Sequence, residues 1–471
     1  MPGLILALLI SVATGFLLTC VLWPAGKGFR GSIGLRLSLG VGLGLGVSSC
    51  VYFLCLILFG PSVTTFVGVD LVVLVCLAVV FGHSFMTSQD APGPVEPPSG
   101  DGRPRASGFL MVGLLVLIVL GVVSFATMVS MKPHGDWDAY VSWNLRARFR
   151  FRGEALWHRA FSPLISRACP GYPVFLPCLV ARCWHYAYRD MVAAPIAVAA
   201  LFTAGVAALG MSALWVLRGR TQGLLGAAAL LGTPWLLMHG TAQYADVPMA
   251  FFFLGTIVLV TLADRFPESR RGLLVLAGFM CGLAVYTKHE GLLFLLGLVI
   301  VAVVWLVRSG DRKACLRRIA PFAAGLALPL LLFVYLKTVL APKANYMVAG
   351  IRTPDVLRRL GDLSRYLYIA RSFAEQVFDL RRWCLLPVVL PFYLLVTGAK
   401  RDDRHRPGVR TGAYVLAFMI LGQFVVYLIT HDKIAWHVTY SIDRFLLELW
   451  PTVVFILLLV ARTPEEALSE G

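Results

Sequence analysis

The chain has 471 residues, of which 58% are hydrophobic and only 14% are charged. Together with a mean hydropathy of +0.79, this composition excludes an ordinary soluble protein and indicates an integral membrane protein with many spans. The formal net charge of +17 does not indicate nucleic-acid binding, because the chain has no basic soluble domain and Lys and Arg in such proteins set topology and contact anionic headgroups. We therefore expect membrane lipids as partners, and no nucleic acid.

Apolar runs long enough to cross a bilayer recur along the whole chain. We expect an all-α polytopic fold with about thirteen transmembrane helices and large outer loops that contain interfacial helices. The expected spans lie near residues 3–23, 33–59, 67–86, 108–130, 191–217, 222–239, 246–263, 272–287, 291–307, 319–340, 383–398, 412–430 and 445–461.

The order of these segments suggests three regions. Residues 1–107 form an N-terminal extension of three spans, which ends in the Pro- and Gly-rich linker from Ser88 to Ser107. Residues 108–461 form the main transmembrane module, and residues 462–471 form a cytoplasmic tail.

Basic residues orient the spans, because they gather in alternate connections and positive charge favours the cytoplasmic side. The N-terminus is then outside. The basic clusters contain Lys27 and Arg30, Arg103 and Arg105, Arg218 and Arg220, Arg265, Arg270 and Arg271, Arg308 to Arg318, and Lys400 to Arg410.

Two long outer loops, residues 131–190 and 341–382, are also rich in arginine. Long loops can translocate despite their charge, so these side chains are either a solvated surface or a set of phosphate-binding groups.

The unusual polar motifs all fall on the outer face in this topology. Ionisable groups at such positions usually mark a site that handles charge or protons. The motifs are Asp136, Asp138 and Tyr140 after the fourth span, Asp246-Val247-Pro248, Lys288-His289-Glu290-Gly291, and Asp443-Arg444. Structural roles are equally open for two of them, since Asp246 can cap a helix and residues 288–290 can form a tight hairpin between two spans.

A proline-rich element lies between these motifs, at Cys169 to Pro177, and includes Tyr172-Pro173. Its prolines exclude an ordinary span. We expect a re-entrant or surface helix over a cavity.

The acidic motif, the Tyr172-Pro173 element, the Asp246-Val247-Pro248 helix start and the Lys288 to Gly291 hairpin occur in an order that resembles the polytopic GT-C glycosyltransferases. The bacterial branch similar to protein O-mannosyltransferases and lipid A aminoarabinose transferases is the most similar. The resemblance covers about residues 108–460, and the chain departs from it in having Cys169 where the family often has His or Lys before the first proline.

The resemblance implies sugar transfer, with inversion, from a polyprenyl-phosphate-linked donor to a hydroxyl of a lipid or glycan acceptor at the outer face of a bacterial cytoplasmic membrane. It assigns the general base to Asp136, or to Asp138 as second choice. Tyr140, Tyr172, Asp246 and Glu290 would contact the substrates, while Lys288, Arg352, Arg365 or Arg444 would neutralise the leaving phosphate.

No His-rich or Cys-rich metal site is present in the sequence, although carboxylates that face phosphate often share Mg²⁺ or Mn²⁺. The alternative function is a transporter or flippase of lipid-linked sugars. Transporters are typically built from internal repeats and helices broken at mid-membrane depth, and the sequence has no evident repeat.

Overall fold

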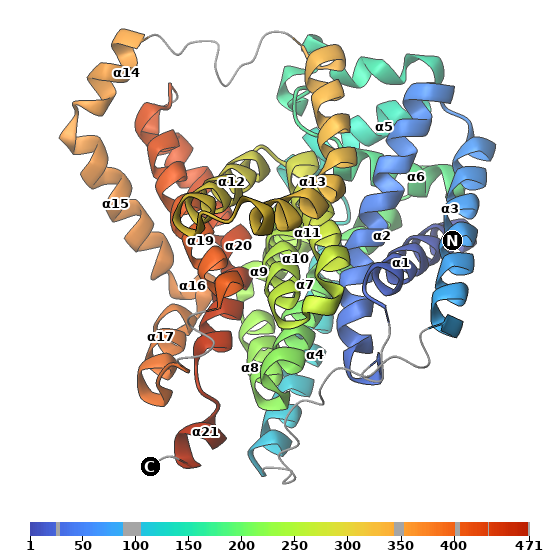
Figure 1. Ribbon diagram of the computed structural model, residues 1–471. Coiled ribbons are helices and arrows are strands. Elements are labelled where there is room, and N and C mark those ends of the chain that lie inside the picture. The colour runs from blue at the N-terminus through green and yellow to red at the C-terminus, as the bar shows by residue number, and fades with distance from the viewer. Residues whose placement is uncertain (25–28, 88–104, 343–352, 401–405, 432, 470–471) are drawn as a thin grey trace.

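The computed structural model describes residues 1–24, 29–87, 105–342, 353–400, 406–431 and 433–469 (Figure 1). The elements in these ranges are helices, and the one other feature is an isolated antiparallel bridge between Ala399 and Ala461. The all-α class expected from the sequence agrees with this architecture.

Among the described residues, eleven helices of 18 residues or more form the body of the molecule. They are α1 (Pro2–Leu22), α2 (Phe29–Phe59), α3 (Val63–Thr87), α4 (Arg105–Met131), α7 (Ala193–Arg218), α10 (Asp246–Arg265), α11 (Arg270–Thr287), α12 (Glu290–Ser309), α13 (Arg312–Tyr335), α19 (Pro407–Ile429) and α20 (Ile434–Val460).

Shorter helices connect them. The α-helices are α5 (Asn144–Arg152), α6 (Phe175–Ala187), α8 (Arg220–Leu231), α9 (Pro234–Thr241), α14 (Thr353–Leu360), α15 (Leu363–Val377), α16 (Leu380–Trp383), α17 (Leu386–Thr397) and α21 (Pro464–Ser469). The π-helices are η1 (Ala139–Trp143) and η5 (Leu336–Leu340), and the 3₁₀-helices are η2 (Glu154–Phe161), η3 (Pro163–Ala168) and η4 (Pro267–Ser269).

Within the described ranges, 10 helices are long and apolar enough to cross a membrane, or 11 if α8 and α9 form one span bent by 59°. The expected count of about thirteen is not confirmed. The expected span at 383–398 is the 12-residue helix α17, which at about 1.5 Å per residue is too short to cross alone. The expected span at 445–461 is only the second half of α20, a helix that carries three charged side chains.

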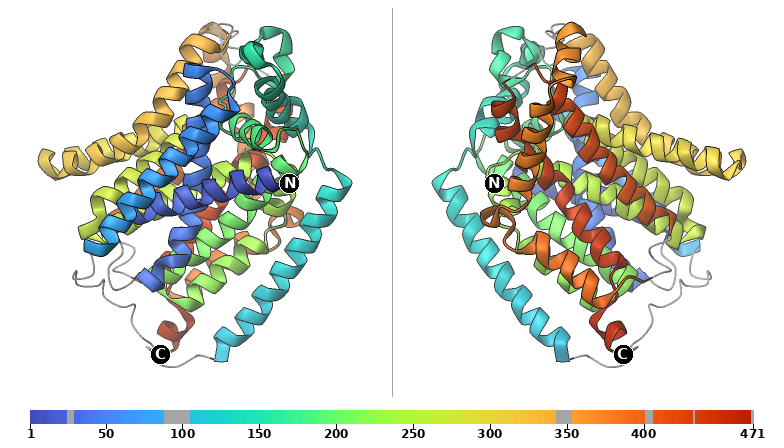
Figure 2. Two further views of the ribbon diagram at one scale, coloured as in Figure 1. Left: turned by 90° about the vertical axis from the view of Figure 1, so that its right-hand side faces the viewer. Right: turned by 90° about the vertical axis from the view of Figure 1, so that its left-hand side faces the viewer.

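α10 is the central helix of the protein, because 94% of the residues in its apolar 18-residue stretch are buried. It packs against α7, α11, α19 and α20. By contrast, only 11% of the corresponding stretch of α3 and 6% of that of α4 are buried. α4 lies along one side of the molecule (Figure 2). The apolar faces of these outer helices are what a lipid environment requires.

The first three helices share one hydrophobic core with the rest of the chain. A buried ion pair joins them to α6, in which Arg182 Nε donates to Asp70 Oδ2 at 2.8 Å. Tyr186 donates to the same oxygen at 2.6 Å, and Arg182 also donates to Ser11 Oγ at 3.1 Å. A boundary near residue 107 stays a prediction, since the core extends across it.

Helices α11 and α13 make close backbone contact at two glycines. A Cβ on Gly278 would lie 1.9 Å from the Phe322 carbonyl oxygen, and one on Gly325 would lie 1.9 Å from the Val275 carbonyl oxygen. No side chain fits at either position without separating the two helices. This contact fixes the distance between α13 and the middle of α11, the helix that leads into Lys288.

We predict that Gly278→Ala destabilises the protein by about 1–3 kcal/mol, because the added methyl group overpacks the α11–α13 contact. The measurement is the thermal unfolding midpoint of the purified protein in detergent. Gly121→Ala on α4 is the matched control, since a Cβ there meets nothing within 4 Å. Equal midpoints for the two variants would contradict the close packing.

Candidate functional site

Charged side chains from four separate parts of the chain meet in one place. They come from the loop after α4, the first turn of α10, the connection between α11 and α12, and the middle of α20. We call this set the charged network, and its members are Asp138, Asp246, Lys288, Glu290, Arg444 and Glu448.

Lys288 is the centre of the charged network. Its Nζ donates to Asp246 Oδ1 at 2.8 Å, lies 3.1 Å from Glu290 Oε1, and donates to Oε1 of the fully buried Glu448. Burial alone would lower the pKa of Lys288, but the negative charges of Asp246, Glu290 and Glu448 outweigh it and hold the pKa well above its ordinary value. Lys288 therefore stays protonated and compensates the buried carboxylates.

Arg444 is the second cation of the network. Its Nε donates to Asp246 Oδ2 at 3.0 Å and its Nη1 donates to Asp138 Oδ2 at 2.7 Å. The guanidinium also lies 4.7 Å from the centre of the Tyr244 ring. One arginine thus joins the carboxylate of the acidic motif to the buried part of the network.

Asp246 binds the cations of the charged network and does not cap its own helix. Ala245 is the cap residue of α10, without a capping side chain, and Asp246 is the first helical residue. Both carboxylate oxygens of Asp246 bind cations, and His239 Nδ1 lies 3.3 Å from Oδ2. The capping role considered from the sequence does not account for this residue.

The acidic motif is held by contacts with the loop between α9 and α10. Asp136 N donates to the Ala242 carbonyl at 3.1 Å, and Gln243 Nε2 donates to the Pro133 carbonyl at 3.0 Å. Gly135 has a positive φ of 73°, and a Cβ there would lie 2.6 Å from the Ala242 carbonyl oxygen. The close approach of the two loops requires glycine at this position.

The two aspartates of the motif have different surroundings. The Asp138 side chain is 32% exposed and pairs with Arg444. The Asp136 side chain is 49% exposed, and both of its oxygens accept from Lys132, four residues earlier. Asp138 therefore belongs to the charged network, whereas Asp136 forms an exposed pair outside it.

The Tyr172-Pro173 element lies beside the connection between α11 and α12. The Tyr172 ring packs on His289 with centroids 4.7 Å apart. Lys337 of η5 donates to the Gly171 carbonyl at 2.6 Å, and its Nζ lies 2.7 Å from His289 Nε2. Burial and the charge of Lys337 lower the pKa of His289 to about 4, so the imidazole is neutral and accepts from Lys337.

Three other residues singled out from the sequence lie apart from the network or outside the described ranges. Tyr140 is exposed and packs edge-on against Trp137 at 5.6 Å. Arg365 donates to the main-chain carbonyl of Tyr427 at 3.1 Å, which joins α15 to α19. Arg352 lies outside the described residues.

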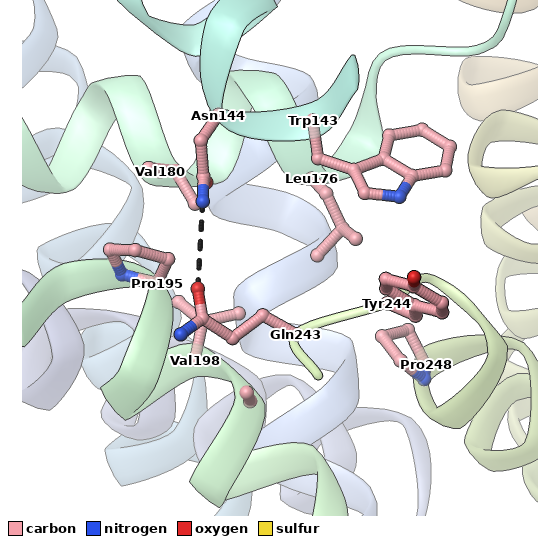
Figure 3. Close-up of a pocket in the computed structure, with 10 residues that line it drawn as sticks. Trp143, Asn144, Leu176, Val180, Pro195, Val198, Gln243, Tyr244 and Pro248 are labelled. Carbon is pink, nitrogen blue, oxygen red and sulfur yellow. Dashed lines mark hydrogen bonds between the residues drawn. The ribbon is translucent and has the colours of Figure 1, made fainter. Parts of the chain in front are cut away.

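A small pocket adjoins the charged network through Tyr244 (Figure 3). On one side of the pocket, Asn144 Nδ2 donates to Gln243 Oε1 at 3.5 Å. Trp143 and Leu176 line another side. Burial and the nearby Asp138 carboxylate raise the pKa of Tyr244 to about 12, so its hydroxyl is neutral. The pocket therefore combines apolar walls with a few neutral polar groups next to a charged region.

Three residues of this region were not found by sequence reasoning. Glu448 is four residues after Arg444 on α20, and this spacing places the two on one helix face. His239 and Lys337 had no comparable indication, because their contacts depend on the bend before α9 and on the π-helical turn that ends α13.

In the part of the chain that the structure describes, no group of three or more His, Cys, Asp or Glu is arranged to hold a metal ion. The carboxylates of the charged network are instead arranged around Lys288 and Arg444. Use of Mg²⁺ or Mn²⁺ stays a prediction.

Comparisons with known protein families, with curated proteins and with solved structures found no match to this chain. The resemblance to GT-C glycosyltransferases accordingly rests on the sequence motifs.

We predict that Lys288→Met destabilises the fold by about 3–5 kcal/mol, because it removes a cation from the buried Asp246 carboxylate together with the shared partner of Glu290 and Glu448. The thermal unfolding midpoint in detergent measures this. Lys132→Met is the control: it breaks an exposed pair whose lysine is 65% exposed and should leave the midpoint nearly unchanged. A Lys288→Met midpoint equal to that of the control would show that the network does not stabilise the fold.

Proposed function

We propose that this protein is a membrane glycosyltransferase that moves a sugar from a polyprenyl-phosphate-linked donor to an acceptor hydroxyl at the outer membrane face, with inversion. The observation that carries the proposal is the contact of Arg444 with both Asp138 and Asp246. It joins the acidic motif to the Asp246 helix start, and Asp246 in turn binds Lys288 of the hairpin motif. A partly exposed carboxylate, anchored in a buried charged network beside a pocket, is the arrangement a general base requires.

Asp138 is the better candidate for the base. Its Oδ2 is held by Arg444, and on the described chain its Oδ1 has no hydrogen-bond partner, so this oxygen is left to accept a proton. Asp136 has no carboxylate oxygen left over in this way, because Lys132 donates to both of its oxygens. The geometry thus favours the second choice from the sequence over the first.

The proposed reaction is a single displacement. The acceptor oxygen forms a bond to the anomeric carbon and gives its proton to Asp138, while the bond between that carbon and the phosphate oxygen breaks. Polyprenyl phosphate leaves with the electron pair of this bond, so negative charge grows on its oxygen and a nearby cation stabilises the transition state.

Lys337 is the better candidate for that cation. Lys288 is already surrounded by three carboxylates, and Arg444 by two. Lys337 is paired with no described carboxylate, is partly exposed, and has one ammonium hydrogen beyond those directed at Gly171 and His289. Its helical neighbours Val334 and Val339 are exposed on the apolar outer face, from which a lipid-borne phosphate would approach.

A transporter or flippase of lipid-linked sugars is the second candidate, and one observation favours it. α8 and α9 form an apolar pair bent by 59°, and Trp235 and His239 of α9 lie close to Arg382 and Asp246 respectively. Discontinuous helices that present polar groups are typical of transporter sites.

We predict that Asp138→Asn lowers sugar transfer at least about 100-fold, because the acceptor proton has lost its base, while Asp136→Asn retains most of the activity. The assay is transfer of radiolabelled sugar from a panel of polyprenyl-phosphate sugars by purified protein, with both variants checked for normal thermal stability. Full activity of Asp138→Asn would remove it as the base. Passage of labelled lipid across proteoliposome membranes without donor consumption would instead establish the flippase.

We also predict that Lys337→Gln weakens use of the donor about tenfold or more in kcat/KM, since it removes a charge-assisted contact to phosphate. Steady-state kinetics with varied donor measure this. Lys313→Gln, an exposed lysine near the other end of α13, is the control. Equal kinetics for the two variants would exclude Lys337 from phosphate binding without touching the assignment of Asp138.

A further inference from the structure

Two arginines of α5 are completely buried without a carboxylate partner. Arg146 and Arg150 are each 0% exposed, and neither forms an ion pair with any Asp or Glu of the described ranges. Arg182 is equally buried, yet it pairs with Asp70. An uncompensated buried charge is strongly destabilising, so each of the two arginines requires an explanation.

Main-chain groups account for Arg146. It donates to the carbonyls of Cys169 and Pro173, and its guanidinium lies 5.5 Å from the centre of the Trp143 ring. These contacts anchor the proline-rich element on α5. Only its Nε remains without an acceptor.

Arg150 is less well satisfied. Its Nη1 donates to the Arg146 carbonyl at 2.7 Å, and the Phe161 ring lies 5.0 Å from the guanidinium carbon. Its Nε and Nη2 are buried and have no oxygen acceptor on the described chain, where the weakly accepting Cys178 thiol is the neighbouring group. Two N–H groups of a cation are thus directed into the protein interior.

Two tyrosines direct further donors to the same region. Tyr52 of α2 and Tyr286 of α11 are 1% and 0% exposed. Neither hydroxyl has an oxygen or nitrogen partner on the described chain, and the group nearest the Tyr286 hydroxyl is the weakly accepting Cys178 thiol. Both side chains lie within electrostatic range of Arg150 and of the Cys178 thiol on α6. Donors from α2, α5 and α11 therefore lie in one buried region.

We propose that Arg150, Tyr52 and Tyr286 bind one small monovalent anion, of which chloride is the physiological example. An anion would balance the charge of Arg150 and accept hydrogen bonds from all three side chains. Complete burial of these groups excludes a bulky headgroup. The site is separate from the one proposed for sugar transfer and does not depend on that function.

The anion would join α5 to the helices behind the charged network. Tyr286 precedes Lys288 by two residues, and Asn144 at the start of α5 lines the pocket. Loss of the ion would therefore loosen the support of the pocket wall without removing any group of the network.

The competing source of negative charge is a thiolate on Cys178. This thiol interacts with both Arg150 and Tyr286, and a thiolate would balance the guanidinium without any bound ion. The two explanations predict opposite responses to chloride and to removal of the thiol.

The test compares thermal unfolding midpoints of the purified protein in chloride and in gluconate at equal ionic strength, together with retention of chloride-36 after prolonged dialysis and rapid desalting. We expect the unfolding midpoint to rise saturably by about 2–4 °C in chloride. We also expect about one labelled chloride ion to be retained per chain. Arg150→Met should abolish both. Arg371→Met is the matched control, because Arg371 is exposed and pairs with Glu375 on the same helix, and it should behave like the wild type.

A second variant keeps the test decisive if Arg150→Met does not fold. Tyr52→Phe combined with Tyr286→Phe retains the arginine but removes two donors, so half-saturation should require about tenfold more chloride. Absence of both the midpoint shift and the retained label in the wild type would overturn the proposal. A thiolate absorption band in the wild type that disappears in Cys178→Ser would overturn it in favour of the thiolate.

Discussion

The structure depends on compensation of negative charge around Lys288. Three carboxylates from α10, α12 and α20 converge on one ammonium group, in a part of the protein where Asp246 and Glu448 are fully buried. Burial of such acidic groups is costly unless a shared cation and hydrogen-bond donor lies between them. The relative positions of these three helices are therefore set by electrostatics as well as by the apolar packing around α10.

This constraint extends to the surface through Arg444. The same arginine that completes the coordination of Asp246 also holds Asp138, so the exposed motif takes its position from the buried network. Gly135 and the contacts of Ala242 and Gln243 supply the second attachment of that loop. A carboxylate fixed from two directions is pre-organised for interaction with a substrate, and this is the physical basis of the proposed chemistry.

Much of this arrangement was accessible from the sequence. The all-helical architecture follows from apolar runs of span length, and the motifs at Asp138, Asp246, Lys288, Glu290 and Arg444 were singled out because polar groups at segment ends are costly unless they share a site. The structure brings these five together. Arg365 shows the limit of such reasoning. The sequence of a polar loop does not indicate whether an arginine binds a ligand or the protein itself, and Arg365 donates to the main-chain carbonyl of Tyr427.

The number of spans was less accessible for a related reason. Hydropathy averages over a window, so it cannot distinguish a straight span from the bent pair α8 and α9, or a full span from the 12-residue helix α17. Lys337 and His239 likewise escaped notice, since their contacts depend on local helix geometry that no spacing rule describes.

The ion pair between Asp70 and Arg182 has a consequence for biosynthesis. The two residues are 112 positions apart, and the ribosome delivers α3 to the membrane well before α6 exists. A lone carboxylate is costly in lipid, so Asp70 lacks its stabilising partner when the third helix first emerges. The Asp70 pair forms only when Arg182 arrives, so the N-terminal helices reach their final packing late in assembly.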